Sequence, residues 1–316
     1  MMLKAILRSR FTPLVALALI MALLPMLAPS SFHLRVAALV WIFALAAVGI
    51  TILMGYAGQV SLGHAGFLGI GAYTVAIGPA RFGLDPLAGL VLGAVLAGLV
   101  AYAVGRPILK LKGYYLAIAT LGFGVIVAMV LHSETEITGG PDGMAVARLS
   151  LFGWRVSGAL SWYWVTAGVL LIGAFLALNI SASPSGRALR ALHDSEVAAA
   201  GTGIDIGAKK LTAFVVAAVY AAVAGGLLAS MNGLITPDAA SFSHSIELVA
   251  MVIIGGLGSV FGAVVGAAFL VVLPQVLTAF QDYEHALLGL LIMVFMILLP
   301  QGIVPSLRSF LTERLP

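Results

Sequence analysis

Long runs of apolar residues alternate with short polar connections along the whole chain. About ten of these runs approach the roughly 20 residues that an α-helix needs to cross a bilayer. They lie near residues 11–27, 34–54, 60–79, 86–105, 114–131, 162–180, 211–231, 246–261, 262–280 and 286–300. The pattern predicts an all-α polytopic membrane protein with about ten transmembrane helices in a single domain, residues 1–316. Residues 246–280 fit either two short spans or one long span with a re-entrant piece.

The composition also indicates a membrane protein. Of the 316 residues, 62% are hydrophobic and 9% are charged, too few charges to solvate the surface of a chain of this length. The absence of cysteine excludes disulfides and thiolate metal sites. The net charge of +4 is small, and no basic run is dense enough for nucleic acid.

The basic residues are distributed unevenly between the two sides that ten spans would create. Twelve of the 16 share one side with both termini: Lys4, Arg8, Arg10, Arg106, Lys110, Lys112, Arg187, Arg190, Lys209, Lys210, Arg308 and Arg314. Four lie opposite: Arg35, Arg81, Arg148 and Arg155. The positive-inside rule therefore predicts cytoplasmic N- and C-termini. The basic start resembles a signal peptide, but the apolar run after it is long, so we expect an uncut first span; cleavage would leave about nine spans.

An external loop is predicted over residues 132–161. It contains the turn-forming run TGGPDGM, and the stretches 149–151 and 154–156 could form a small hairpin about Phe152-Gly153. The loop is either a lid or connector, or a contact for an external partner.

A cytoplasmic loop is predicted over residues 181–210, and its pattern favours an amphipathic helix that begins at Pro184 or Ser185 and ends at Gly201 or Gly203. Its apolar side would carry Ala188, Leu189, Leu192, Val197 and Ala200. Its charged side would carry Arg187, Arg190, Asp194 and Glu196. The helix is either a solvated connector or a docking element for a soluble partner.

Residues 55–74, GYAGQVSLGHAGFLGIGAYT, combine six glycines with the polar residues Gln59, Ser61 and His64. Buried polar groups are costly in lipid unless protein or water satisfies them, so this segment is expected to line a pathway. For His64, a buried histidine bonded to a neighbouring carbonyl is the alternative.

Small residues at helical spacing predict close helix packing. If residues 55–74 form one continuous helix, Gly55, Gly58, Gly66 and Gly69 share about a quarter of its circumference, with Ser61 and His64 roughly opposite. Two further rows have four-residue spacing: Gly89, Gly93 and Ala97, and Gly258, Gly262 and Gly266.

The sequence lacks a recognisable catalytic or cofactor-binding motif. It has no HExxH and no Gly-x-Ser-x-Gly, and the stretch 203–209, GIDIGAK, departs from a phosphate loop by the extra Ala208. No span has a central charged residue, and Glu247 falls at an outer end, where solvation or helix capping is expected. We therefore expect a transport protein without cofactor or metal, rather than an enzyme.

Five motifs in order carry a resemblance that covers about residues 34–304. They are GYAGQVSLGHAGFLGIGAYT, GYYLAIATLGFG, TGGPDGM, SPSGRALRALHDSEVAAAGTGI and IELVAMVIIGGLGSVFGAVVGA. Read together, they resemble the permease subunits of branched-chain amino acid ABC importers.

The resemblance implies a complex in the cell inner membrane with a second, similar permease, two ATPase subunits and an external substrate-binding protein. It also implies that residues 185–203 couple to an ATPase through Arg187, Arg190, Asp194 and Glu196. Substrate would then cross between the two permeases along a surface that includes Gln59, Ser61 and His64.

Two positions depart from the family pattern. His193 stands where arginine is frequent, and residues 125–128 read VIVA where many relatives have Glu-Ile-Val-Arg. Branched-chain or other hydrophobic amino acids are the expected substrates; urea, short amides and small carboxylates are alternatives. A stand-alone carrier or channel for a small neutral solute is the rival class.

Overall fold

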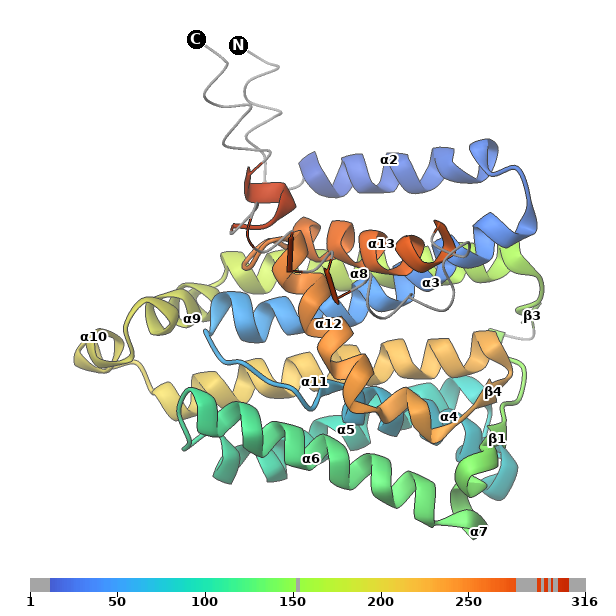
Figure 1. Ribbon diagram of the computed structural model, residues 1–316, viewed down its shortest axis with the longest axis horizontal. Helices are drawn as coiled ribbons and strands as arrows, with labels where there is room; N and C mark the ends of the chain where they lie inside the picture. Colours follow the sequence, from blue (N-terminus) through green and yellow to red (C-terminus); the bar gives the residue numbers. More distant parts are fainter. Residues whose placement is uncertain are drawn as a thin grey trace.

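The computed structural model describes residues 12–151, 154–276, 289, 290, 293, 294, 297 and 301–306. Its main helices are α2 (Thr12–Leu27), α3 (Ser31–Ile50), α4 (His64–Phe82), α5 (Pro86–Ile108), α6 (Tyr114–Ser133), α8 (Ala159–Ala182), α11 (Ile206–Asn232), α12 (Phe242–Gly255) and α13 (Val260–Val276). Short elements are η1 (Thr51–Tyr56), α7 (Thr135–Thr138), η2 (Gly140–Asp142), α9 (Pro184–Asp194), α10 (Glu196–Gly201) and η3 (Pro237–Ala240). The predicted all-α class is confirmed (Figure 1).

Within these residues, five segments are long and apolar enough to cross a membrane: Ser31–Tyr56, α5, α6, α8 and α11. Helices α2, α12 and α13 are apolar but shorter. In the region 246–280, α12 ends at Gly255 and α13 begins at Val260, so the break comes earlier than the predicted boundary at 261/262. Positive φ angles at Gly256 and Gly258 account for the earlier break. The last predicted run, 286–300, lies largely outside the described residues.

The predicted span at 60–79 and the continuous helix over 55–74 are wrong at their start. Helix α3 passes into the π-helix η1, which ends at Tyr56. Residues 57–63 are not helical, and α4 begins only at His64. Gly58 adopts a φ of +65°, a left-handed conformation that stops the preceding helix and suits glycine.

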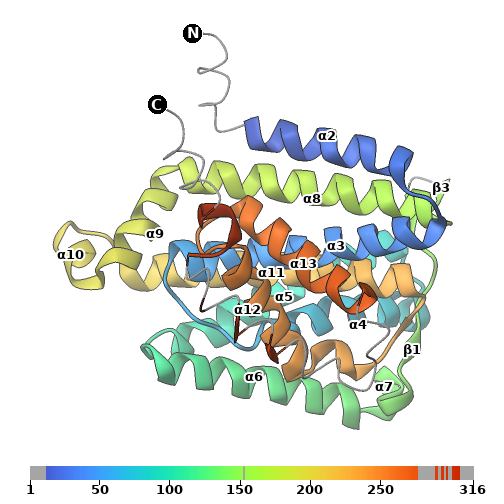
Figure 2. The same cartoon turned by 45° about the horizontal axis from the view of Figure 1, so that its top comes forward.

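The loops predicted for opposite sides of the membrane gather at opposite ends of the bundle. At one end, α9 and α10 project beyond the other helices, and Lys112 from the α5–α6 connection lies 3.7 Å from Glu196 (Figures 1 and 2). At the other end, β1 (Met144–Ala145) pairs with β4 (Leu234–Ile235). We call these the docking end and the strand end. Helix α2 starts at the docking end, while the two chain termini lie outside the described residues.

The hairpin predicted in the external loop is confirmed. Strands β2 (Ser150–Leu151) and β3 (Trp154–Arg155) pair antiparallel, and Val156 N–H donates to Leu149 O at 3.0 Å. Ser150 Oγ also donates to Asp85 Oδ2 at 2.9 Å. This hydrogen bond therefore joins the hairpin to Asp85, the N-cap residue of α5, at the strand end.

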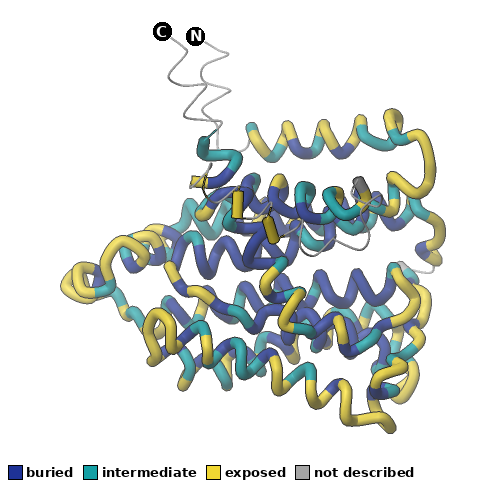
Figure 3. The backbone as a smooth tube through the Cα atoms, viewed as in Figure 1, coloured by how far each residue is buried: buried dark blue, intermediate teal, exposed yellow. Residues whose placement is uncertain are grey.

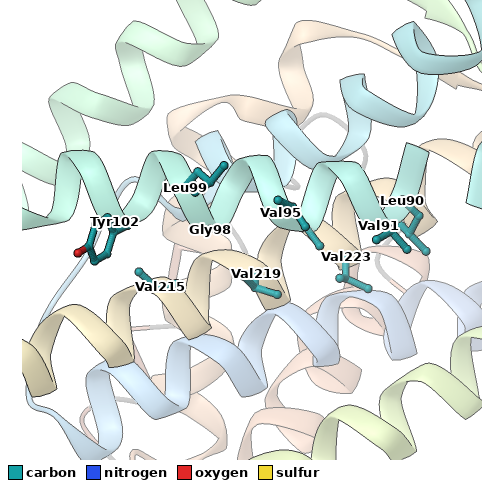
Figure 4. A pocket seen from close by; sticks show the side chains of 10 residues that line it. Leu90, Val91, Val95, Gly98, Leu99, Tyr102, Val215, Val219 and Val223 are labelled. Carbon is teal, nitrogen blue, oxygen red and sulfur yellow. The ribbon is translucent and has the colours of Figure 1, made fainter. Parts of the chain in front are cut away.

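The core lies around α3 and α11, and the other long helices surround it (Figure 3). The most apolar window is 83% buried in the segment Ser31–Tyr56 and 61% buried in α11, against 22% in both α5 and α6. An apolar groove of about 660 Å³ lies on the outside between α5 and α11, lined by residues such as Val95, Leu99 and Val219 (Figure 4). Such apolar outer faces suit contact with lipid.

The close helix packing predicted for the glycine rows is found for some of their members and not for others. Gly89 and Gly93 of α5 pack closely on α4, as predicted. Gly66 and Gly69 do lie on α4, but Gly66 faces Gly124 of α6 and Gly69 faces Ala240 of η3.

The rows that begin at Gly55 and at Gly258 hold only in part, because helix breaks separate their members. Gly55 is in η1 and Gly58 is in the extended segment, so neither shares a face of α4 with Gly66 and Gly69. Gly258 lies in the turn before α13 and abuts Gly55, whereas Gly262 and Gly266 pack against Gly255 and Met251 of α12.

Candidate functional site: the docking loop and the extended segment beside it

Residues 57–63, which we call the extended segment, present alternate side chains to opposite sides. Gln59 and Ser61 are 6% and 2% exposed, whereas Val60 is 42% exposed. Alternation of this kind is expected of an extended backbone. The polar side chains therefore point into the protein, and Gly58 and Val60 are the exposed residues of the segment.

His64 is fully buried at the start of α4. Its Nδ1 lies 2.8 Å from Ser61 Oγ, and its ring packs edge-on against Phe67 and Phe214. Its Nε2 has no hydrogen-bond partner among the described residues. The arrangement is closer to the buried-histidine interpretation than to pathway lining, although the partner is a hydroxyl and not a carbonyl.

Polar contacts with neighbouring helices hold the end of the extended segment. Leu62 N–H donates to Thr120 Oγ1 of α6 at 3.1 Å, and Ala65 N–H donates to Ser245 Oγ of α12 at 3.1 Å. Gly63 lies against the backbone of Thr120, where a side chain would collide. A movement of this segment would therefore shift its contacts with α6 and α12.

The predicted amphipathic helix of the docking loop (residues 181–210) is instead two helices. Ser195 has extended backbone angles, φ −162° and ψ 115°, which separate α9 from α10. Ser183 Oγ caps α9 by accepting from Gly186 N–H, and Ser195 Oγ caps α10 by accepting from Ala198 N–H. Serine is a favoured N-cap, so two serines define two helix starts.

The two-helix arrangement changes which side chains face outward. Leu189 and Leu192 are buried, and Arg187, Arg190 and Asp194 are exposed, as predicted. The predicted apolar side fails on α10, where Val197 is 83% exposed and Ala200 is also exposed. The break at Ser195 rotates α10 relative to α9 and brings these residues to the surface.

Glu196 turns inward instead of joining the exposed charges. Its Oε1 lies 2.5 Å from Nζ of Lys210, whose side chain is only 3% exposed. Burial acts to raise the pKa of the Glu196 carboxyl, but the hydrogen bond and charge of Lys210, with the charge of Lys112, outweigh it and hold this pKa below its ordinary value. Lys210 was not singled out in the sequence, because it lies 14 residues from its partner.

The docking loop contacts the extended segment and the end of η1 directly. The guanidinium carbon of Arg190 lies 5.9 Å from the ring centre of Tyr56, and a Cβ on Gly58 would be 2.9 Å from His193 Nδ1. The two regions singled out separately in the sequence thus form one site at the docking end (Figure 1).

Glu247 lies in the second turn of α12; its side chain is 46% exposed, and its Oε2 lies 2.9 Å from His244 Nδ1. The expected solvated or capping role of this carboxylate stays a prediction. Among the described residues, no group of three or more His, Cys, Asp or Glu could hold a metal ion.

Comparison with known proteins decides the family. The profile described as "Branched-chain amino acid transport system / permease component" matches residues 32–298. The chain belongs to this permease family. The permease is thus a transport subunit embedded in a membrane through several helices.

Curated relatives of the permease support the same family assignment. It is 34% identical to the high-affinity branched-chain amino acid transport system permease protein LivM of Escherichia coli K12, over 86% of this chain and 70% of the relative. It is 26% identical to LivH of the same organism, over 83% and 91%. A probable LivM of Methanocaldococcus jannaschii is also 26% identical, over 70% and 71%. No solved structure matches the permease significantly.

Proposed function

We propose that this chain is the transmembrane permease subunit of an ATP-driven ABC importer in the cell inner membrane. It would form the translocation pathway with a second, similar permease, driven by two ATPase subunits and supplied by an external substrate-binding protein. The similarity to both LivM and LivH supports a pair of related permeases. Their printed names support branched-chain amino acids, with other hydrophobic amino acids as near alternatives.

The shape of the docking loop is the observation that carries the ATPase coupling. Helices α9 and α10 project from one end of the bundle (Figure 2), with Arg187, Arg190 and Asp194 exposed. Val197 is 83% exposed beyond the apolar helices, where an exposed apolar side chain suits a protein interface better than water. We propose that this tip sits on an ATPase subunit, which would move it when nucleotide closes the ATPase pair.

For the translocation route, we propose that the extended segment borders the path of the substrate. Its exposed residues are Gly58 and Val60, whereas Gln59, Ser61 and His64 would fix its conformation from the buried side. A pathway of this kind has few polar groups. It would rely on the external binding protein for affinity and specificity.

Charge reversal at Arg187 tests the coupling. We expect Arg187→Glu to reduce co-purification of the ATPase subunits and to abolish ATP-driven uptake without changing the yield of folded permease. Arg155→Glu, an exposed arginine at the strand end, is the matched control and should keep ATPase binding. Glu196→Arg is unsuitable for this test because it would leave the buried Lys210 beside a second cation.

Two results would contradict the proposal. One is uptake that continues after deletion of every candidate ATPase, which would favour a stand-alone carrier or channel. The other is equal ATPase co-purification with Arg187→Glu and the wild type. The substrate is tested separately by ligand binding to the companion external protein; preference for urea, an amide or a carboxylate would overturn the amino-acid assignment alone.

A further inference from the structure

The apolar groove between α5 and α11 runs along one face of α5 and leads to a basic residue. It is lined on α5 by residues that recur at helical spacing from Leu90 to Tyr102, and on α11 by three valines. Tyr102 lies at one end of the groove beside Val215, and Leu90 lies at the other end (Figure 4). Arg106 follows Tyr102 by four residues, so it continues the same face one turn nearer to the docking end.

The dimensions and lining of the groove suit an acyl chain. From Leu90 to Tyr102 helix α5 rises by ~18 Å, and one leaflet of the hydrocarbon core is ~15 Å deep. At the middle, Gly98 contributes no side chain, and a Cβ placed there would lie 3.3 Å from Val219 Cγ2. The groove is therefore a long apolar channel whose floor is formed by α11 and whose one polar lining group is the Tyr102 hydroxyl.

Arg106 is exposed and is held at the end of the groove by Tyr102. Its Nη2 donates to the Tyr102 hydroxyl, and its guanidinium carbon lies 4.3 Å from the centre of the tyrosine ring. The ion pairs formed by the described residues do not include Arg106. A guanidinium carries five N–H donors, so most of them remain available to a phosphate group, which arginine binds in a forked geometry.

The charge around this end of the groove favours an anionic headgroup. Residues 86–133, which include α5, α6 and their connection, contain Arg106, Lys110 and Lys112 but no Asp or Glu. All three cations are exposed. Basic sites between helices at the membrane surface attract anionic lipid headgroups.

The second permease fits this place less well than lipid does. We have proposed that substrate passes beside the extended segment, between the two permeases. That segment contacts α6 and α12, and it contributes no residue to the groove, whose lining comes from α5 and α11 alone. The groove is thus separate from the surface on which the second permease is expected.

We propose that the groove is a binding site for an anionic phospholipid of the leaflet at the docking end. One acyl chain lies between α5 and α11, and the phosphate accepts hydrogen bonds from Arg106, whose position Tyr102 fixes. The site requires only that the permease is embedded in a membrane. It therefore depends neither on an ATPase nor on the identity of the substrate.

Binding of phosphatidylglycerol to the complete, delipidated permease chain tests the site, with native mass spectrometry as the readout. We expect Arg106→Gln to weaken binding by about fivefold or more, the effect of one basic residue at an anionic lipid surface. Lys112→Gln is the matched control: it removes the same charge at the same end, from a side chain that is 77% exposed and outside the groove. This control should keep the wild-type affinity.

A second variant tests the acyl chain separately from the headgroup. Val219→Phe places a ring in the middle of the groove while leaving Arg106 unchanged, and it should also weaken the binding of phosphatidylglycerol. Val215→Phe, at the end beside Tyr102, takes its place if Val219→Phe fails to fold. Glycerol 3-phosphate has the anionic phosphate without the chains and should not compete.

Three results of these titrations would overturn the proposal. Equal losses in Arg106→Gln and Lys112→Gln would show general attraction to a basic surface. Competition by glycerol 3-phosphate would show a site for free phosphate. Unchanged binding in the variant with the filled groove would show that the chain does not lie there.

A cross-link tests protein as the occupant. Leu99 lines the groove and is 60% exposed, so Leu99→Cys provides a thiol there in a chain without cysteine. In the assembled importer, we expect this thiol to react with a lipid-soluble maleimide and not to cross-link to the second permease. An efficient cross-link between the two permeases from this position would refute the lipid site.

Discussion

The crossing of α4 and α11 gives a quantitative test of the fold. A methyl group on Gly225 would overlap the carbonyl oxygen of Leu68 and would lie 2.7 Å from its carbonyl carbon. These are backbone atoms, so no side-chain rotation can relieve the contact, and the two helices must separate. Overpacking of this kind costs ~1–3 kcal/mol. We expect Gly225→Ala to destabilise the permease by that amount, less the small gain in helix propensity.

Gly122→Ala is the matched control. Gly122 also lies in a helix, α6, but no heavy atom lies within 4 Å of the added methyl group, so the change should be neutral or stabilise by about 0.5–1 kcal/mol. Because the propensity gain is common to both variants, their difference isolates the overlap. For a chain of this size it corresponds to ~2–6 °C in apparent melting temperature.

Intrinsic fluorescence on heating in detergent measures this difference, since the chain has four tryptophans. The wild type and both variants are compared at one protein and detergent concentration. Equal melting temperatures for Gly225→Ala and Gly122→Ala would refute the close crossing of α4 and α11.

Two further predictions concern the docking end. The pKa of Glu196 is held below its ordinary value of 4.5, so its pairing stabilises the permease above that value and is lost as pH falls below it, through the lowered pKa. As the pH is lowered below 4.5, the wild type should therefore lose more thermal stability than Glu196→Gln, and parallel curves would contradict this. Gly58→Ala and Gly83→Ala both place alanine at a positive φ, +65° and +61°, at about 1 kcal/mol each. Only Gly58 faces a neighbour, His193, so ATP-driven uptake should fall for Gly58→Ala alone; equal uptake in both variants would count against the contact.

Much of the bundle could be predicted because apolar length is a local signal. The runs that became α5, α6, α8 and α11 were found within a few residues of their bounds, and the hairpin of β2 and β3 followed from its turn residues. The extended segment was missed because glycine-rich sequence suits both close helix packing and a break in a helix. Only the φ of Gly58 distinguishes them.

The site was predicted in parts but not as a whole. Leu189 and Leu192 were placed correctly from helical periodicity, but periodicity fails beyond Ser195, where a second helix begins. A signal for this break was present, since serine followed by an acidic residue is a typical helix start. The partner of Glu196 was not predictable, because Lys210 reaches it through tertiary packing.

A cross-link from the tip of the docking loop tests the central claim most directly. The chain has no cysteine, so Val197→Cys provides one thiol at a position that is 83% exposed. In the assembled importer, we expect a cross-link from this thiol to an ATPase subunit whose yield changes when ATP is added, while a thiol at Trp154 of the strand end gives none. An intact, ATP-driven importer in which position 197 never cross-links to an ATPase would contradict the account.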